Sequence, residues 1–458
     1  MPDCASTAFI PSATSGRHPG NSALRLLFLL AALVAAAPAS AQTPVRVWHV
    51  LSGPSRTALE TMATAFNTAN PDYAIKPVAM TQSSTVMSRI DEETRRAKPE
   101  YPPLVIVSES ASGDIGAPGG LAYPVSSLLT DMAEPYDPDA FMPAVRASYS
   151  DRNGALLAIP FLLTTPVLYV DAKSVQAAGF DPVKDLKTWS GFEAVAAKLS
   201  AAGGGSCAAA MQAPSWIAVE NLLAMHDRPF ASFDNGRGGG DARIAADVDF
   251  LSRHLTRLVD MARGGALRPR TAGVEPVAAF IGRACPMLLG TSGLLAHVRA
   301  RAPFEVAVLP LPFLDDVTNP PKPSLPGGFA VWALRGRPPA EIKGAAKFAA
   351  FLATPEAQAW LAREIRSIPS TFEGWKRTQA DGIVNAEPGL AVAASELAGQ
   401  LPTAASKSPR LQGKAEIDGF FDAAFDFAFQ GLKQPRPALV DAVQRSDMLL
   451  RQRREGDR

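Results

Sequence analysis

Cysteine and histidine are scarce in this chain of 458 residues, which contains three cysteines and five histidines. No C-x-x-C or H-x-x-x-H spacing occurs, so the usual ligand patterns of a zinc site are missing. We therefore expect no metal and no cofactor.

An excess of charge of either sign is also missing. The chain has 45 Lys and Arg against 44 Asp and Glu, with a formal net charge of +1. Such a balance gives no electrostatic reason to expect nucleic acid or an anionic membrane as partner. Apolar residues make up 47% and charged residues 19%, which is typical of a globular protein. The length exceeds the roughly 250–300 residues of a single core, and this predicts two packed lobes.

Two glycine-rich runs come close to catalytic motifs and miss them. Residues 236–240 (GRGGG) lack the Lys-Ser/Thr of a nucleotide cradle, and Asp241 stands where a dinucleotide fingerprint needs glycine. We therefore expect a solvated loop there. Residues 204–208 (GGSCA) differ from a nucleophile elbow because Ala208 replaces the last glycine. The sequence thus predicts no catalytic residue and no enzyme.

The beginning of the chain has the pattern of an export signal. Arg17 and Arg25 precede the apolar run 26–37, and Pro38-Ala39-Ser40-Ala41 supplies small residues for cleavage. Twelve apolar residues are few for a bilayer core roughly 30 Å thick, although an uncleaved anchor stays as the alternative. No cysteine stands at this point to carry a lipid. We expect residues 1–41 to be removed and the mature protein to be soluble in the periplasm.

Export would leave two cysteines in an oxidising compartment. Cys4 is lost with the signal, and Cys207 and Cys285 remain. We predict that they form one disulfide. Two separate buried thiols are the alternative.

Strand-like and helix-like segments alternate along the first part of the mature chain. The strand-like segments are short and apolar, and the helix-like segments repeat apolar residues at a 3.6-residue spacing. In order they are a strand at 45–50, a helix from 54 to 70, a strand at 73–79, an amphipathic stretch at 86–96 and a strand at 104–107. This alternation predicts an α/β fold with a doubly wound parallel sheet.

The alternation then repeats and ends in helices. We expect one long interrupted strand at 158–169, a helix capped by Thr188, and further strands and helices. The remaining strands fall at 207–211, 287–289, 306–309 and 327–334, and the last helices at 245–262, 341–352, 354–364, 418–429 and around 439–449. The pattern predicts two sheets followed by a helical C-terminal region.

Several short segments, in this order and spacing, resemble the family-1 extracellular solute-binding proteins of ABC importers. Each motif is weak alone, but together they cover residues 45 to 450. They are Trp48-His49, Phe66-Asn67, Asn70-Pro71-Asp72-Tyr73, Pro160-Phe161, residues 165–169 (TPVLY), Ser215-Trp216-Ile217, Glu220-Asn221, residues 229–232 (PFAS), Ser292-Gly293, Gly327-Gly328 and Arg410-Leu411. The similarity is strongest to members that bind glycerol phosphates, and Cys207 and Cys285 fall where a cysteine pair lies in them.

The resemblance implies a two-lobed periplasmic-binding-protein (Venus-flytrap) fold that closes on a ligand between the lobes. Mapped onto this chain, lobe 1 holds residues 42–160 with 290–328, and lobe 2 holds 161–289 with 329–458. The chain would cross between the lobes near 160–166, near Leu289 and within 327–334. The implied partners are a small phosphorylated polyol and two permease subunits with a cytoplasmic ATPase. We also expect a monomer.

The resemblance also implies ligand-binding residues. Arg410 matches the arginine that faces phosphate, for which a planar guanidinium is well suited. Thr164 and Thr291 replace serines and keep a hydroxyl, and Gly328 offers a backbone N–H. Glu109 would accept hydrogen bonds from glycerol hydroxyls, and Trp216 would form an apolar wall. Taken alone, Arg410 also fits a surface ion pair, Glu109 a helix cap and Trp216 a core residue.

Three positions depart from the pattern of the family. Ser83 and Ser367 stand where tyrosines are expected, and Ala213 replaces a second tryptophan in the cleft. Losing three rings would widen the pocket, so we expect either a bulkier glycerophosphodiester or a drift toward another polyol or sugar. The sequence therefore predicts capture of glycerol-3-phosphate or a glycerophosphodiester. Its alternatives are a sugar-binding protein of the same fold and a periplasmic hydrolase.

Overall fold

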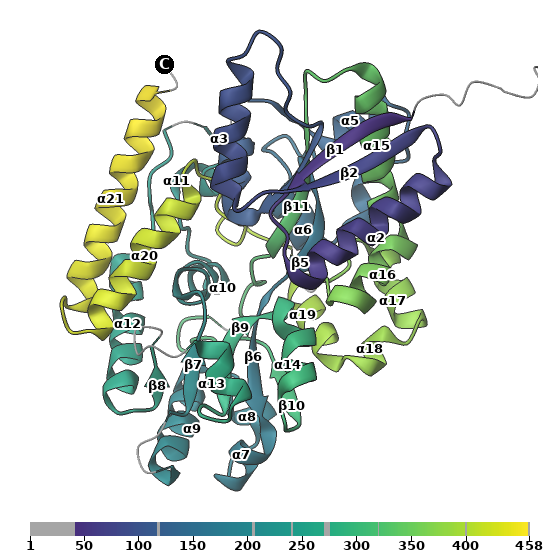
Figure 1. Cartoon of the computed structure of the whole chain (residues 1–458). Helices are drawn as coiled ribbons and strands as arrows, with labels where there is room; N and C mark the ends of the chain where they lie inside the picture. The colour runs from purple at the N-terminus through teal and green to yellow at the C-terminus, as the bar shows by residue number, and fades with distance from the viewer. Residues whose placement is uncertain are drawn as a thin grey trace, which may run out of the picture. The chain divides into compact units, whose positions relative to one another are not determined.

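The computed structural model describes residues 42–116, 120–203, 207–239, 241–269, 275–318, 320–398 and 401–456. The expected signal peptide and its cleavage point at Ala41 lie outside these residues. Thr43–Arg458 forms one compact unit, in which two sheets stand at different levels (Figure 1).

The first sheet begins with the apolar strand that the sequence predicts. Val45 and Val47 of this strand are fully buried, because both faces of the sheet are covered by helices. Across the sheet the order is β2 (Tyr73–Ala79), β1 (Thr43–His49), β3 (Leu104–Ser108), β11 (Gly327–Leu334) and β4 (Ala122–Tyr123), with β5 (Ala158–Thr164) also paired to β11. β2, β1 and β3 are parallel, whereas β11 is antiparallel to β3 and β5. The sheet is therefore mixed, not wholly parallel as expected.

Helices from both ends of the chain cover this sheet. α2 (Gly53–Ala69) buries Leu59, Met62 and Phe66 at the spacing expected of one helical face. α15 (Pro339–Ala353) contacts β1 and α5 (Val125–Asp131), and α16 (Pro355–Ile365) contacts α2. Phe66 packs edge-on against Phe348 of α15, with ring centroids 5.3 Å apart. α15 and α16, which come late in the sequence, therefore pack in the same core as the first strands.

The second sheet has its own layers of helices. Its order is β10 (Val306–Leu309), β6 (Pro166–Asp171), β9 (Met287–Thr291), β7 (Ala209–Met211) and β8 (Leu267–Arg268). β6 is antiparallel to β9 and β10, and β7 is parallel to β9 and β8. Beside it, α9 (Trp189–Ala202) begins at Thr188, whose hydroxyl accepts from the Gly191 amide as a helix cap.

Two segments join the sheets differently from the expectation. The predicted single strand at 158–169 is two strands, because Pro166 cannot donate to a ladder and the chain leaves β5 for β6 at Thr165. Segment 290–309 stays with the second sheet through α14 (Leu295–Arg301) and β10. β11, α15 and α16 belong to the first sheet, so residues 310–326 form the return crossing.

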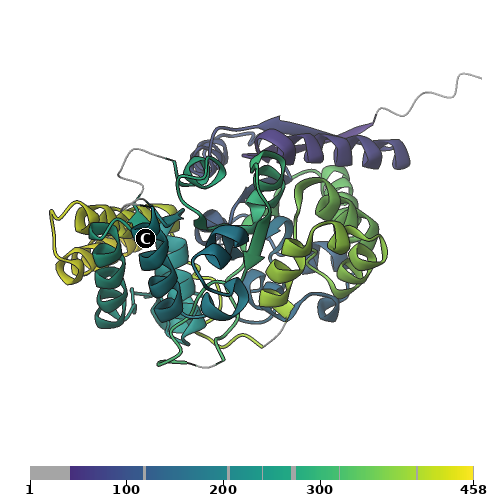
Figure 2. The same cartoon turned by 90° about the horizontal axis from the view of Figure 1, so that it is seen from below.

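The C-terminal helices pack beside the second sheet. α20 (Lys414–Phe429) and α21 (Pro435–Gly456) contact each other and α12 (Val248–Arg263), as both views show (Figures 1 and 2). The expected helical C-terminal region is confirmed. In the described part of the chain, no helix is both long enough and apolar enough to cross a bilayer.

The predicted disulfide is confirmed. Cys207 and Cys285 are bonded, with Cα atoms 4.9 Å apart and a sequence separation of 78. Cys207 precedes β7 and Cys285 precedes β9, and these strands are parallel neighbours. The bond therefore links the starts of two adjacent central strands.

Candidate functional site

Four predicted site residues lie at one edge of the first sheet. β3 and β5 end there and β11 begins there, so Glu109, Thr164 and Gly328 come close in space although they are far apart in sequence. Ser83 begins α3 (Ser83–Thr94), and its hydroxyl lies 3.0 Å from that of Ser108. Carboxyl ends of parallel strands are where α/β folds commonly bind ligands.

Gly328 has a structural reason to be glycine. Its φ is +105°, and a Cβ there would lie 1.9 Å from the carbonyl oxygen of Leu162 on β5. Only glycine fits such a backbone next to a neighbouring strand. Gly328 therefore shapes the edge of the sheet, and this role does not depend on a contact between its N–H and a ligand.

Thr291, on the second sheet, and Trp216, on the π-helix η3 (Ser215–Asn221), meet the first sheet at this edge. Thr291 ends β9, and its Oγ1 accepts from the Gly293 amide at 3.2 Å. A Cβ on Gly293 would contact the methyl group of Thr164 at 3.2 Å. The ring of Trp216 would be 2.7 Å from a Cβ on Gly327. The two threonines and Trp216 are therefore gathered around the crossing between the sheets.

The position of Ser367 differs from that of a ligand-facing residue. Its side chain is buried, and its Oγ accepts from the Leu163 amide at 3.0 Å and lies 3.4 Å from the Phe161 carbonyl. The hydroxyl thus fixes this segment to β5. At the other departure, Ala213 adopts a positive φ of 45°, and its carbonyl accepts from the Trp216 amide at the start of η3.

Arg410 is brought to the site by an extended segment before α20. Its backbone amide donates to the Asn235 carbonyl at 2.8 Å, and its Nη1 and Nη2 donate to the carbonyls of Ser150 and Ser148 at 2.9 and 2.8 Å. The side chain is 9% exposed, and its Nε has no partner among the described residues. Burial lowers the pKa of Arg410, while Glu109 opposes that shift. The guanidinium is therefore not the surface ion pair considered from the sequence.

Arg237 is a second arginine beside Arg410, partly buried, which the sequence does not single out. Its Nη2 donates to the Ser148 carbonyl at 3.0 Å, which is the oxygen that Arg410 also contacts. Nε and Nη1 of Arg237 are buried with no partner among the described residues. Burial, followed by the nearby Arg410, lowers the pKa of Arg237 to about 9. Residues 236–239 form a loop as expected, with Gly238 exposed, but the Arg237 side chain turns partly inward.

The glycines around Arg237 explain why the segment lies so close. A Cβ on Gly236 would be 2.3 Å from the Arg410 carbonyl oxygen, and Gly236 has a φ of +86°. The glycine-rich run is not a nucleotide cradle. Its Gly236 lets the segment that carries Arg237 approach the segment that carries Arg410. No local sequence signal predicts this contact, because it joins Gly236 to Arg410 far along the chain.

Carboxylates complete the electrostatics of the site. Burial raises the pKa of Glu109, against the opposing influence of Lys414 and Arg237. Glu109 follows β3 directly, and its nearest described partner is the Ser112 hydroxyl at 3.4 Å. By contrast, the buried Lys414 is paired with Glu220 at 2.7 Å and with Asp418 at 2.5 Å. Glu109 thus keeps acceptor capacity, whereas Lys414 is already neutralised.

A cavity of about 730 Å³ lies beside the two arginines. Its walls also carry Arg152, Arg335 and Arg454, and Asp151 is the one acidic side chain among the described residues that line it. Guanidinium groups that lack carboxylate partners in a basic cavity can bind an anion bidentately. The described residues contain no group of three or more His, Cys, Asp and Glu that could hold a metal.

Two mixed sheets joined by crossing segments, with polar residues where their edges meet, define the class of periplasmic binding proteins. The profile of bacterial extracellular solute-binding proteins matches residues 61–379. The chain is also 31% identical over 420 residues to the sn-glycerol-3-phosphate-binding periplasmic protein UgpB of Yersinia pseudotuberculosis, covering 92% of this chain and 95% of the relative. UgpB of Salmonella paratyphi A is 31% identical over 414 residues, covering 90% and 94%.

This chain therefore belongs to the family of bacterial extracellular solute-binding proteins, as the sequence resemblance predicts. It is a binding protein, and the hydrolase considered as an alternative is ruled out by this membership.

Solved structures of the same fold confirm the architecture. UgpB from Mycobacterium tuberculosis in complex with glycerophosphocholine gives a TM-score of 0.73 at 16% identity, covering 90% of this chain and 99% of that one. The cyclic alpha-maltosyl-1,6-maltose binding protein from Arthrobacter globiformis gives 0.70 at 19% identity, covering 89% and 99%.

Proposed function

We propose that this protein captures sn-glycerol-3-phosphate or a glycerophosphodiester in the periplasm and delivers it to an ABC importer. The observation that carries this proposal is the pair formed by the buried Arg410 and the partly buried Arg237. They share one carbonyl oxygen, and three of their nitrogens have no partner among the described residues. Two desolvated like charges are costly, and a bound phosphate would offset that cost. The curated relatives named for sn-glycerol-3-phosphate support the same ligand.

The other predicted residues do not line the 730 Å³ cavity beside the arginines, and they would contact the glycerol part at the edge where the two sheets meet. Glu109 has acceptor capacity for hydroxyl groups, and the hydroxyls of Thr164 and Thr291 lie where the two sheets meet. Ser367 is buried against β5 and lines none of the described cavities, so it gives no support for a larger head group.

Membership in the family supports a role in an ABC importer, and this role implies the partners of the protein. The partners would be two permease subunits and an ATPase, and the protein would act as a soluble monomer after cleavage near Ala41. We infer that the lobes follow the sheets, with residues 43–164 and 327–365 in one and 166–309 and 414–456 in the other.

A sugar is the alternative ligand. Trp216 is partly exposed beside Gly327, and an aromatic face with a nearby carboxylate is a common way to hold a sugar. Calorimetry with glycerol-3-phosphate, glycerophosphocholine and maltose separates the two. We expect binding of at least one phosphate compound and none of maltose. A maltose response without any phosphate response would contradict the phosphate proposal.

Replacing Arg410 by alanine tests the residue directly. We expect Arg410→Ala to weaken phosphate binding by about 2–5 kcal/mol, the scale for one partner of a buried charged pair. Arg253→Ala, on the exposed face of α12, is the matched control and should bind as the parent does. Thermal melts of both variants check folding. Equal affinity in Arg410→Ala and parent would remove Arg410 from the site.

A further inference from the structure

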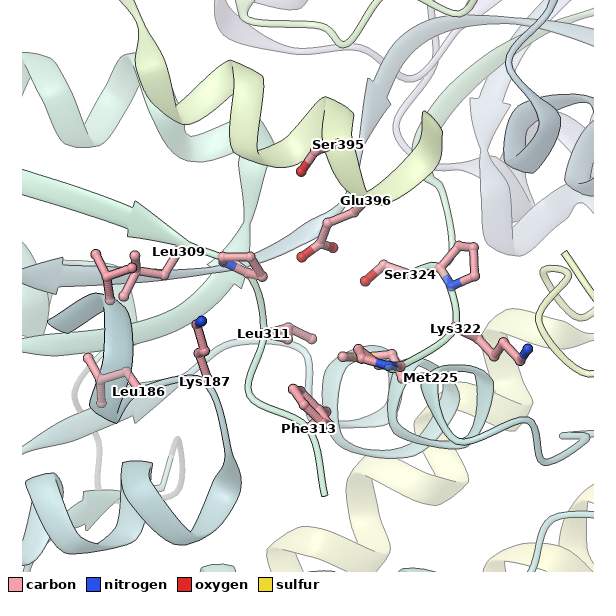
Figure 3. A pocket seen from close by; sticks show the side chains of 14 residues that line it. Leu186, Lys187, Met225, Leu309, Leu311, Phe313, Lys322, Ser324, Ser395 and Glu396 are labelled. Carbon is pink, nitrogen blue, oxygen red and sulfur yellow. The ribbon is translucent and has the colours of Figure 1, made fainter. Parts of the chain in front are cut away.

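A second cavity lies apart from the arginines and has a different character. It encloses about 440 Å³ between the end of β10, the crossing segment 310–326 and the last turn of α19 (Pro388–Ala398). Its walls are mostly apolar and include Leu186, Met225, Leu309, Leu311 and Phe313 (Figure 3). Pockets of this size and lining are typical of sites for small organic molecules.

One ionisable group reaches into this apolar space. The carboxyl of Glu396 points into the cavity toward Ser324 (Figure 3). Its Oε2 is buried and has no hydrogen-bond partner among the described residues. Burial raises the pKa of Glu396 to about 8, although hydrogen bonds with Ser324 and the Leu311 backbone oppose the shift. A buried polar atom without a partner is rare and calls for an explanation.

The two hydrogen bonds of the Glu396 carboxyl indicate which of its protonation states the cavity stabilises. Both hydrogen bonds lower the pKa of Glu396, so both stabilise the ionised form, which accepts hydrogen bonds. The carboxylate therefore has part of the solvation that an acceptor needs. A positive group at Oε2 would supply the rest.

We propose that this cavity binds a small organic ammonium ion, with its alkyl or aryl body against the apolar wall and its N–H groups on Glu396. The carboxyl gives up its proton to solvent when the ligand enters, and the ammonium then donates to the carboxylate. A charge-assisted bond in a desolvated pocket is stronger than a neutral one. The site is separate from Arg237 and Arg410, and it does not depend on the phosphate proposal.

The other charged groups that the structure describes near the cavity are not paired with the carboxyl of Glu396. Lys187, between α8 (Pro182–Asp185) and α9, is exposed, and Lys322 on the crossing segment points away from Glu396 (Figure 3). His226, at the end of α10 (Leu222–Met225), accepts from the Leu314 amide through Nε2. At the start of α19, Glu387 is paired with Arg299.

Hexylamine tests the proposal because it stays protonated across the pH range of interest. Only the ionised form of Glu396 binds it, so the apparent association constant scales with the ionised fraction. For a pKa of about 8, that constant should rise about 25-fold from pH 6.5 to 8.5. Calorimetry in buffers of different ionisation enthalpy should show close to one proton released per ligand at the lower pH. The neutral analogue 1-hexanol should bind at least about 10-fold more weakly at pH 8.5.

Glu396→Gln keeps the shape of the side chain and removes its charge. This variant should lose both the pH dependence and at least about 10-fold in hexylamine affinity. The exposed Glu364→Gln is the control and should behave as the parent. The proposal would be overturned if hexylamine did not bind, or if its affinity did not depend on pH. It would also be overturned if Glu396→Gln bound hexylamine as the parent does, or if 1-hexanol bound as tightly as hexylamine. Thermal melts show that each variant is folded.

Discussion

A single missing side chain shapes the edge of the first sheet. Gly328 combines a positive φ with a close approach to the Leu162 carbonyl oxygen, so two separate constraints exclude any side chain. We expect Gly328→Ala to lower the free energy of unfolding by at least about 2 kcal/mol, because the Cβ adds both backbone strain and an overlap with β5. Urea unfolding followed by circular dichroism measures this change.

Gly382 provides the matched control. Its φ is +71°, but a Cβ there would meet nothing within 4 Å. Gly382→Ala therefore carries only the backbone strain, about 1–2 kcal/mol. If both variants lose the same stability, the contact with Leu162 does not matter and Gly328 owes its identity to something else.

The two arginines show what single residues reveal in a sequence. Arg410 could be selected because its surroundings resemble a known family, and the structure buries it. Arg237 could not, since its partial burial depends on the close approach of segments 236–239 and 408–413, which are far apart in the chain. The same reason applies to Ser367, whose bond to Leu163 spans 204 residues.

At the scale of elements, the apolar pattern of the sequence predicts where strands lie better than it predicts which strands pair with each other. β11 lies at 327–334 as predicted, because a buried strand is a continuous apolar run. Its membership in the first sheet was not foreseen, since no local pattern states which strand a segment will pair with. The predicted strand at 158–169 failed for a related reason: Thr165 and Pro166 mark a change of sheet inside one apolar run.

The disulfide stabilises the second sheet at the level of its strands. It joins the residues before β7 and β9 and closes a long loop, because its cysteines have a sequence separation of 78. In the chain-entropy model a loop of this length contributes about 4 kcal/mol. We expect the double variant Cys207→Ala/Cys285→Ala to lose stability on that scale in denaturant unfolding.

Reductant provides the internal control for this experiment. Dithiothreitol should destabilise the parent by a similar amount and leave the double variant unchanged. A parent whose unfolding midpoint does not move, although its mass after alkylation shows both thiols free, would mean that the bond contributes nothing measurable.

For the whole molecule, the crossing segments decide how the two sheets can move against each other. Thr165 stands between β5 and β6, where its amide donates to the Ser292 hydroxyl at 3.1 Å and its hydroxyl to the Ala393 carbonyl at 3.3 Å. Few residues form this connection, so small changes in backbone angles there would move one sheet relative to the other. The proposed ligand contacts come from both sides of the crossing. Glu109 lies on the side of the first sheet, whereas Thr291, Trp216 and the segment that carries Arg410 lie on the side of the second.

A ligand that makes contacts on both sides can only be fully bound when the sheets approach, so binding shifts the population toward the closed form. We expect small-angle X-ray scattering to show a smaller radius of gyration at saturating glycerol-3-phosphate or glycerophosphocholine. Arg410→Ala should require a much higher ligand concentration for the same change, whereas Arg253→Ala should follow the parent. A radius that stays constant while calorimetry shows a saturated site would mean that the ligand is held by one side alone. Arg237 and Arg410 would then form a local anion site with no part in closure.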